Sequence, residues 1–140
     1  MIRTALRRGM FASRPEALRD ARALVESFSA AAGLDERACA KLTLVVEELF
    51  VNTVTHGHGG GADAPVWITL ASAPGAVRLT YEDHAPPFNP FAEGAAMAPA
   101  EPAGETRVGG LGVHLTRTFT GDPDYAYLFG RNRLRLAMAV

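Results

Sequence analysis

One long segment, from Asp35 to about His56, constrains the fold of this chain more than any other stretch. Its apolar residues recur at helical spacing, Asp35 is a suitable N-cap, and the glycines from Gly57 onward would end a helix. Winding the segment at about 100° per residue produces one core-facing stripe, formed by Leu42, Val46, Leu49 and Thr53. Because that stripe must be buried, the rest of the chain has to supply a second layer.

Short β-rich runs supply that layer. Four runs predict strands, at Val66–Leu70, Val77–Tyr81, Tyr125–Phe129 and Arg133–Val140. The first two flank a turn signal at Ala73–Gly75, and the last two flank a predicted turn at Gly130–Asn132. Each pair is therefore expected to form an antiparallel hairpin.

The N-terminal part predicts a strand and a first helix. Ile2–Leu6 is expected to form a short strand. Ser13–Glu16 resembles a capping box with an early proline, and the helix that it begins is expected to end at Gly33. Residues 84–108 lack periodicity and are rich in Pro, Ala and Gly, which is typical of a functional lid or a disordered segment. A short helix is expected after Gly109–Gly112.

The order of these elements predicts an α+β fold with two layers. Helices would cover one face of a mixed, mostly antiparallel sheet, and residues 1–140 would form a single domain. The arrangement is not a series of right-handed crossover units, which disfavours a dinucleotide-binding fold of the doubly wound type.

Charge and hydropathy exclude several classes of function. The formal net charge is -1, from 14 Lys and Arg against 15 Asp and Glu, so no overall electrostatic footprint for nucleic acid is present. No apolar run is long enough to cross a membrane and no signal-peptide pattern follows the basic N-terminus, which predicts a cytoplasmic protein. The single cysteine, Cys39, is expected to be a small buried hydrophobe.

The long helix also carries polar residues that need an explanation. Glu48 and Asn52 lie one turn apart on a stripe beside the core face, and their oxygens could together face a hard cation such as Mg²⁺. Taken alone, a pair at this spacing more often faces water, so the helix by itself does not define a site. Glu47 points about a quarter-turn away and is expected to be a solvated neighbour without a role.

Histidines at the end of this helix suggest a second possibility. His56 and His58 could supply two ligands to zinc, with Glu48 two turns earlier. A third ligand is not evident in the sequence, so zinc is the weaker alternative.

Two further motifs bear on the same question. Asp83 ends a predicted strand and precedes a rigid His84–Pro90 turn, where a carboxylate could accept a hydrogen bond from an exocyclic amine of a bound base. It could also be a turn-forming residue only. Gly109–Gly112 opens a helix whose N-terminus would suit an anion, although packing glycines look the same and no P-loop lysine follows.

Together these motifs resemble the histidine kinase-like (GHKL) ATPase superfamily, whose nucleotide-binding domain has the Bergerat-type fold. The chain is more narrowly similar to the small bacterial anti-sigma-factor serine kinases of sporulation and stress-response switches. The motifs that carry the resemblance are Glu48-x-x-x-Asn52, the helix end Asn52–Gly57, Asp83 with its Pro-Phe turn, Gly110–Leu115, Asp122-x-x-Tyr125 and Gly130–Asn132.

The resemblance implies a role for each matching residue. Glu48 matches the general base, and Asn52 matches the ligand of the Mg²⁺ that bridges the phosphates of ATP. Asp83 matches the acceptor of the adenine amine. The expected nucleotide contacts at the lid and the last hairpin are Gly110, Leu111, Gly112 and Asn132.

Two departures from the family pattern affect these expectations. Ala85 stands where relatives usually have glycine, which would narrow the base pocket. The predicted lid, about 84–108, contains Arg107 and no lysine. The negative charge of the γ-phosphate would therefore be stabilised by Mg²⁺, backbone amides and Arg107 or Arg117.

The function implied by the resemblance is that of an ATP-dependent protein-serine kinase that is also an anti-sigma factor. Its partners would be an anti-anti-sigma antagonist of the STAS type, phosphorylated on serine, and a sigma factor. A homodimer without direct contact to nucleic acid or membrane is expected. The alternative is a catalytically weak regulator that uses ATP only to order its partner-binding surface.

Overall fold

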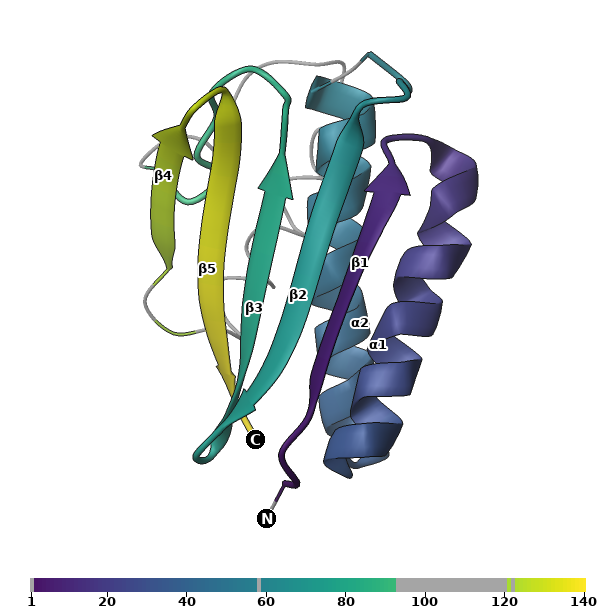
Figure 1. Ribbon diagram of the computed structural model, residues 1–140, viewed down its shortest axis with the longest axis vertical. Coiled ribbons are helices and arrows are strands. Elements are labelled where there is room, and N and C mark those ends of the chain that lie inside the picture. Colours follow the sequence, from purple (N-terminus) through teal and green to yellow (C-terminus); the bar gives the residue numbers. More distant parts are fainter. Residues whose placement is uncertain (1, 58, 93–120, 122) are drawn as a thin grey trace, which may run out of the picture.

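A computed structural model describes residues 2–57, 59–92, 121 and 123–140 of the chain. In this part, two helices cover one face of a five-stranded sheet, which confirms the predicted two-layer α+β architecture (Figure 1). The helices are α1 (Leu18–Ala32) and α2 (Glu36–Asn52). The strands are β1 (Leu6–Ala12), β2 (Pro65–Ala73), β3 (Ala76–Asp83), β4 (Asp124–Leu128) and β5 (Arg131–Ala139).

The sheet has the order β1-β2-β3-β5-β4, and each of its four pairings is antiparallel. β5 therefore inserts between β3 and β4, as the yellow strand beside β3 in Figure 1 shows. Its register sets Asp83, at the end of β3, directly opposite Asn132, near the start of β5. Two residues that are 49 positions apart in the sequence thus become neighbours.

Buried residues alternate with more exposed ones along the central strands, and the buried ones form the core. Every second residue of β3 and β5 is buried, as are Val66, Ile68 and Leu70 of β2, which is the pattern of a sheet with one covered face. These side chains pack against α1, mainly through Val25 and Phe28, and against α2. All four residues of the predicted α2 stripe are buried, as are Val45 and Phe50.

The ends of both helices follow local capping chemistry. Gly33 ends α1 in the left-handed conformation, with φ 74°, and the Asp35 side chain caps α2 by accepting from Ala38 N at 2.8 Å. Both predictions are confirmed. The last helical turn, Thr53–Gly57 (η2), widens into a π-helix, a distortion that is frequent at functional sites.

The N-terminal expectations were partly wrong. The first strand is Leu6–Ala12 and not Ile2–Leu6. Arg3, near the start of the predicted strand, instead donates its backbone N–H to Ala32 O at the end of α1. The Ser13 hydroxyl does not cap a helix but donates to Ala64 O at 2.8 Å, ahead of β2. A one-turn 3-10 helix, Pro15–Ala17 (η1), precedes α1.

The last hairpin also differs from the prediction. Its turn consists of Phe129 and Gly130, and Arg131 and Asn132 are the first two residues of β5. Both turn residues have positive φ, 53° and 76°, which matches the tight type I′ geometry of two-residue hairpins. The hairpin predicted around Ala73–Gly75 is confirmed, since β2 ends at Ala73 and β3 begins at Ala76.

Two expectations concern residues outside the described part. Most of the predicted lid, from residue 93 onward, and the helix expected after Gly109–Gly112 lie there. Among the described residues, no helix combines the length and the apolar character needed to cross a bilayer.

Candidate functional site

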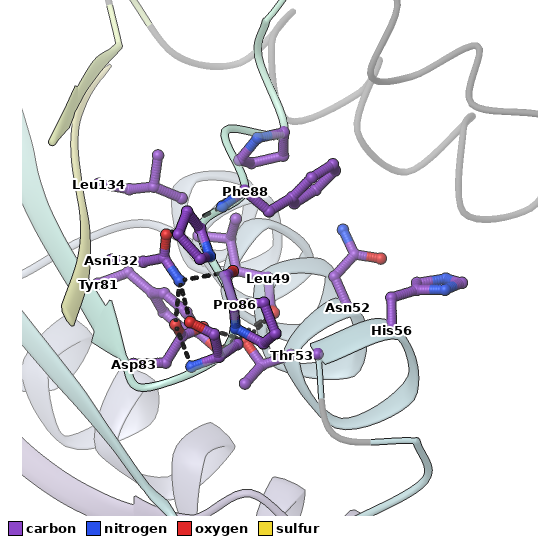
Figure 2. A pocket seen from close by; sticks show the side chains of 14 residues that line it. Leu49, Asn52, Thr53, His56, Tyr81, Asp83, Pro86, Phe88, Asn132 and Leu134 are labelled. Carbon is purple, nitrogen blue, oxygen red and sulfur yellow. Dashed lines mark hydrogen bonds between the residues drawn. The ribbon is translucent and has the colours of Figure 1, made fainter. Parts of the chain in front are cut away.

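A cavity of about 280 Å³ opens between the C-terminal end of α2 and the adjoining ends of β3 and β5. Its walls are largely apolar, with Leu49, Leu134 and the Pro86–Phe88 turn among them (Figure 2). The polar side chains that line it are few: Asn52, Thr53, His56, Tyr81, Asp83 and Asn132. An apolar cavity with a few converging polar groups is the usual form of a small-molecule site.

Asp83 is the buried acid of this cavity, with only 6% of its surface exposed. Its Oδ1 accepts from Asn132 Nδ2 at 2.9 Å and from Ala85 N at 3.2 Å. Its Oδ2 accepts from Thr53 Oγ1 at 2.8 Å. Because a carboxylate offers about four lone-pair directions, these three bonds leave one acceptor position, on Oδ2, that no described residue fills. That position suits a single N–H donor of a ligand.

Thr53 connects this carboxylate to a buried tyrosine. Its Oγ1 lies 2.6 Å from Tyr81 OH, which is also 3.1 Å from Leu49 O. Burial raises the pKa of Tyr81 well above its ordinary value, so the phenol stays protonated and remains a donor. A consistent assignment has Thr53 donating its single proton to Asp83, with Tyr81 donating to Thr53 or to Leu49 O.

Thr53 is the functional residue that the sequence interpretation missed. Its position on the buried stripe of α2 predicted a core residue, and it is buried. The hydroxyl, however, donates a hydrogen bond to the carboxylate of Asp83, at the end of β3. The available signal was a hydrogen-bonding side chain within an otherwise apolar stripe, directly after Asn52.

Asn132 lies opposite Asp83 and is equally buried. Its Nδ2 is within hydrogen-bonding distance of Asp83 Oδ1, of Ala85 O at 2.9 Å and of Pro86 O at 3.2 Å. Its Oδ1 accepts from Phe88 N at 3.1 Å and from Tyr125 OH. Asn132 is thus part of the cavity wall and also holds the chain from Asp83 to Phe88 in its turn.

Asn52 and His56 occupy the wall formed by α2 and η2, where Figure 2 shows them beside each other. Asn52 is half-buried and presents a carboxamide, whose oxygen is a ligand type that Mg²⁺ accepts. The alternative of a zinc site gains no support from the described residues, where no three His, Cys, Asp or Glu side chains gather. His58 is outside those residues.

Glu48 lies one turn before Asn52 on α2, but it is not among the described residues that line the cavity. Burial, and to a lesser extent the charge of Glu47, raise the pKa of the Glu48 carboxyl above its ordinary value. A raised pKa is one property of carboxylates that take up protons in catalysis. Glu47 has a structural contact that was not expected, because its carboxylate binds Arg22 of α1 at 3.0 Å.

Ala85, the departure from the family pattern, meets Gly57 at the cavity wall. A Cβ added to Gly57 would lie 2.7 Å from Ala85 Cβ, closer than two such atoms can approach. The absence of a side chain at Gly57 therefore accommodates the methyl group of Ala85. The remaining nucleotide contacts expected from the sequence, Gly110, Leu111 and Gly112, lie outside the described residues, as do Arg107 and Arg117.

This combination defines a class of protein. A two-layer α+β fold holds a buried strand-end carboxylate, with one acceptor position left open by the described residues, at an apolar cavity beside an asparagine-bearing helix end. That is the arrangement of a nucleotide-binding domain of the histidine kinase-like type.

Comparison with protein families identifies the particular family. Residues 11–138 match the model of the histidine kinase-like ATPase domain, and the chain belongs to this family. No curated protein sequence matches the chain.

A solved structure has the same fold. The chain is similar to the crystal structure of the RsbU and RsbW domains of Rv1364c from Mycobacterium tuberculosis, with a TM-score of 0.67 and 17% identity. The match covers 97% of this chain and 32% of that one, so the chain spans about a third of the length of its structural relative.

Proposed function

We propose that the protein binds Mg-ATP in this cavity and acts as a protein-serine kinase and anti-sigma factor in a partner-switching system. The observation that carries the proposal is the single free acceptor position of buried Asp83 at an apolar cavity of suitable size for a base. An acceptor in that position favours adenine, which has an exocyclic amine, over guanine, which has a carbonyl at the equivalent atom.

The residues around the cavity would divide the work of binding. The apolar wall with Leu49 and Leu134 would enclose the base, while Asp83 would accept its amine. The oxygen of Asn52 fits one ligand position of Mg²⁺, whose other ligands would be phosphate oxygens and water. When bound, the ion would offset negative charge on the phosphates. Gly110, Leu111 and Gly112 are the proposed contacts of the phosphates at the lid.

Transfer would require a base near the γ-phosphate. In the proposed reaction, the hydroxyl oxygen of a serine on the antagonist protein attacks the γ-phosphorus, and the bond from that phosphorus to the β,γ-bridging oxygen breaks, which releases ADP. Glu48 would take the serine proton, for which its raised pKa is favourable. Its place one turn from Asn52 puts the base and the metal ligand on one side of α2.

The similar solved structure contains RsbU and RsbW domains, and this likeness supports the partner-switching role proposed for the present chain. For this chain we propose an anti-anti-sigma protein of the STAS type as the phosphorylated antagonist. A sigma factor is the proposed sequestered partner, with a cytoplasmic homodimer as the working form.

A second candidate function has one observation in its favour. Glu48 is not among the described residues that line the cavity, and such a placement also suits a regulator that binds ATP without efficient transfer. In that case ATP would only order the surface that meets the partner.

The test is a transfer assay with γ-labelled ATP and the candidate antagonist. The proposed kinase should label the antagonist on serine, and Glu48→Ala should abolish labelling while leaving ATP affinity within about threefold. Glu47→Ala is the matched control, since that neighbour instead contacts Arg22, and it should keep wild-type activity. Undiminished transfer by Glu48→Ala would remove Glu48 as the base, and ATP binding without transfer by the wild type would favour the second candidate.

A further inference from the structure

Asn132 has no free hydrogen-bonding capacity in its side chain. The two hydrogens of Nδ2 already have three acceptors within reach, and the two lone pairs of Oδ1 already have two donors. A nucleotide could bind directly to this amide only if one of these buried bonds broke. The expectation that Asn132 is itself a nucleotide contact therefore does not fit its surroundings.

The contacts of Asn132 instead converge on Asp83 and the turn that follows it. Nδ2 binds Asp83 Oδ1 and the carbonyls of Ala85 and Pro86, so a single amide fixes both the acid and its backbone. With Oδ1 bound on this side and Oδ2 bound by Thr53, the carboxylate cannot rotate freely. Its remaining lone pair is thereby held in one direction.

We propose that Asn132 is a positioning residue that holds Asp83 in the orientation needed to select a purine with a 6-amino group. The proposal rests on the nucleotide-binding function proposed above and assigns the base specificity of that site. Asn132 acts through Asp83 and does not touch the base.

Tyr125 completes the arrangement from the edge strand. Its hydroxyl donates to Asn132 Oδ1, and Phe88 N donates to the same oxygen. These two donors fix which end of the amide is the oxygen, so that Nδ2 has to face Asp83. Tyr125 is not among the described residues that line the cavity, and it therefore offers a way to disturb Asn132 from outside the site.

The proposal is tested by removing a functional group from both the protein and the ligand. Asn132→Asp keeps the size of the side chain and an oxygen for Phe88 N and Tyr125 OH, but replaces the Nδ2 donor with an oxygen that faces the Asp83 carboxylate. The ligands are ATP and purine riboside 5′-triphosphate, which lacks the 6-amino group. Calorimetry gives the dissociation constant of each ligand for each protein.

The wild type should prefer ATP by about tenfold or more, the worth of one hydrogen bond to a buried charged group. Asn132→Asp should reduce this preference to about twofold or less, mainly by weakening the binding of ATP. The control is Asn89→Asp, which makes the same change of charge in the same turn, at a residue whose Oδ1 accepts from Phe91 N at 2.9 Å and from no other described residue. It should keep the wild-type preference.

If Asn132→Asp lowered the affinity for both triphosphates equally, the role of Asn132 would be merely structural, and the proposal would be overturned. Tyr125→Phe provides a milder variant, which keeps the ring and should lower the preference for ATP about two- to fivefold by releasing one end of the Asn132 amide. An unchanged preference in Tyr125→Phe would also contradict the proposal. Failure of the nucleotide-binding function itself would appear differently, as a wild type that binds neither triphosphate.

Discussion

Replacing Thr53 with valine should both destabilise the protein and weaken its nucleotide site. The side chains have nearly the same shape, so the change mainly removes the hydroxyl that donates to Asp83 Oδ2 at 2.8 Å. Tyr81 OH keeps Leu49 O as an acceptor, but Oδ2 loses the one described protein donor that it has. The cost is therefore that of a buried carboxylate oxygen left without a partner.

Hydrogen bonds to charged groups contribute about 1.5–3 kcal/mol, and Asp83 is almost fully buried, so Thr53→Val should lower the free energy of unfolding by about 2 kcal/mol. For a chain of this length that corresponds to a fall of roughly 6 °C in Tm. Because Asp83 also loses one of the bonds that orient it, ATP affinity should fall about tenfold.

Urea denaturation followed by circular dichroism measures the first effect, and calorimetric titration with Mg-ATP measures the second. The control is Thr43→Val on the preceding helix α2, where the hydroxyl donates to the backbone oxygen of Cys39, four residues earlier, and to no other described residue. That variant should lose no more than about 0.5 kcal/mol. If Thr53→Val proved as stable as Thr43→Val, the hydroxyl would not support the Asp83 carboxylate as argued.

Three other substitutions have defined outcomes. Gly57→Ala should cost about 1–2 kcal/mol in urea denaturation through its clash with Ala85, and the additional change Ala85→Gly should restore most of that loss; no recovery would contradict the contact. Phe129→Asn should raise the free energy of unfolding by about 1 kcal/mol, because Phe129 has φ 53° and a fully exposed ring, and a loss of stability would show that the ring has a packing role. Glu48→Gln should stabilise the protein at pH 7.5 and not at pH 3.5. Because the Glu48 pKa is raised in the folded protein, ionisation of Glu48 lowers the free energy of unfolding, and this loss develops as the pH rises through that pKa. The stabilisation by Glu48→Gln should stay below about 1 kcal/mol, because the side chain is partly solvated. An equal effect at both pH values would exclude ionisation of Glu48 as its cause.

The sequence was sufficient for the layers of the fold. Alternation in β2 and β3 and the helical stripe of α2 identify which residues are buried, because both periods are set by backbone geometry. β1 was placed too early because Leu6–Ala12 includes two arginines and a glycine, a composition with little strand preference. Its pairing with β2, which is a tertiary contact, decides where the strand lies.

Less of the candidate site than of the fold could be predicted from the sequence. Asp83 and Asn52 were predicted from motifs, and both line the cavity. The partnership of Asp83 with Asn132 depends on β5 lying next to β3 and on Asn132 being a strand residue, neither of which a turn signal at Gly130 indicates. The role of Thr53 depends likewise on a carboxylate brought to it by another strand.

Calorimetric comparison of Mg-ATP with Mg-GTP tests the central claim most directly, namely that Asp83 makes this cavity a site for adenine nucleotides. The account predicts saturable binding of ATP at one site per chain, with GTP at least about tenfold weaker because its carbonyl would face the carboxylate. Equal affinity for the two nucleotides, or no binding of either, would contradict it.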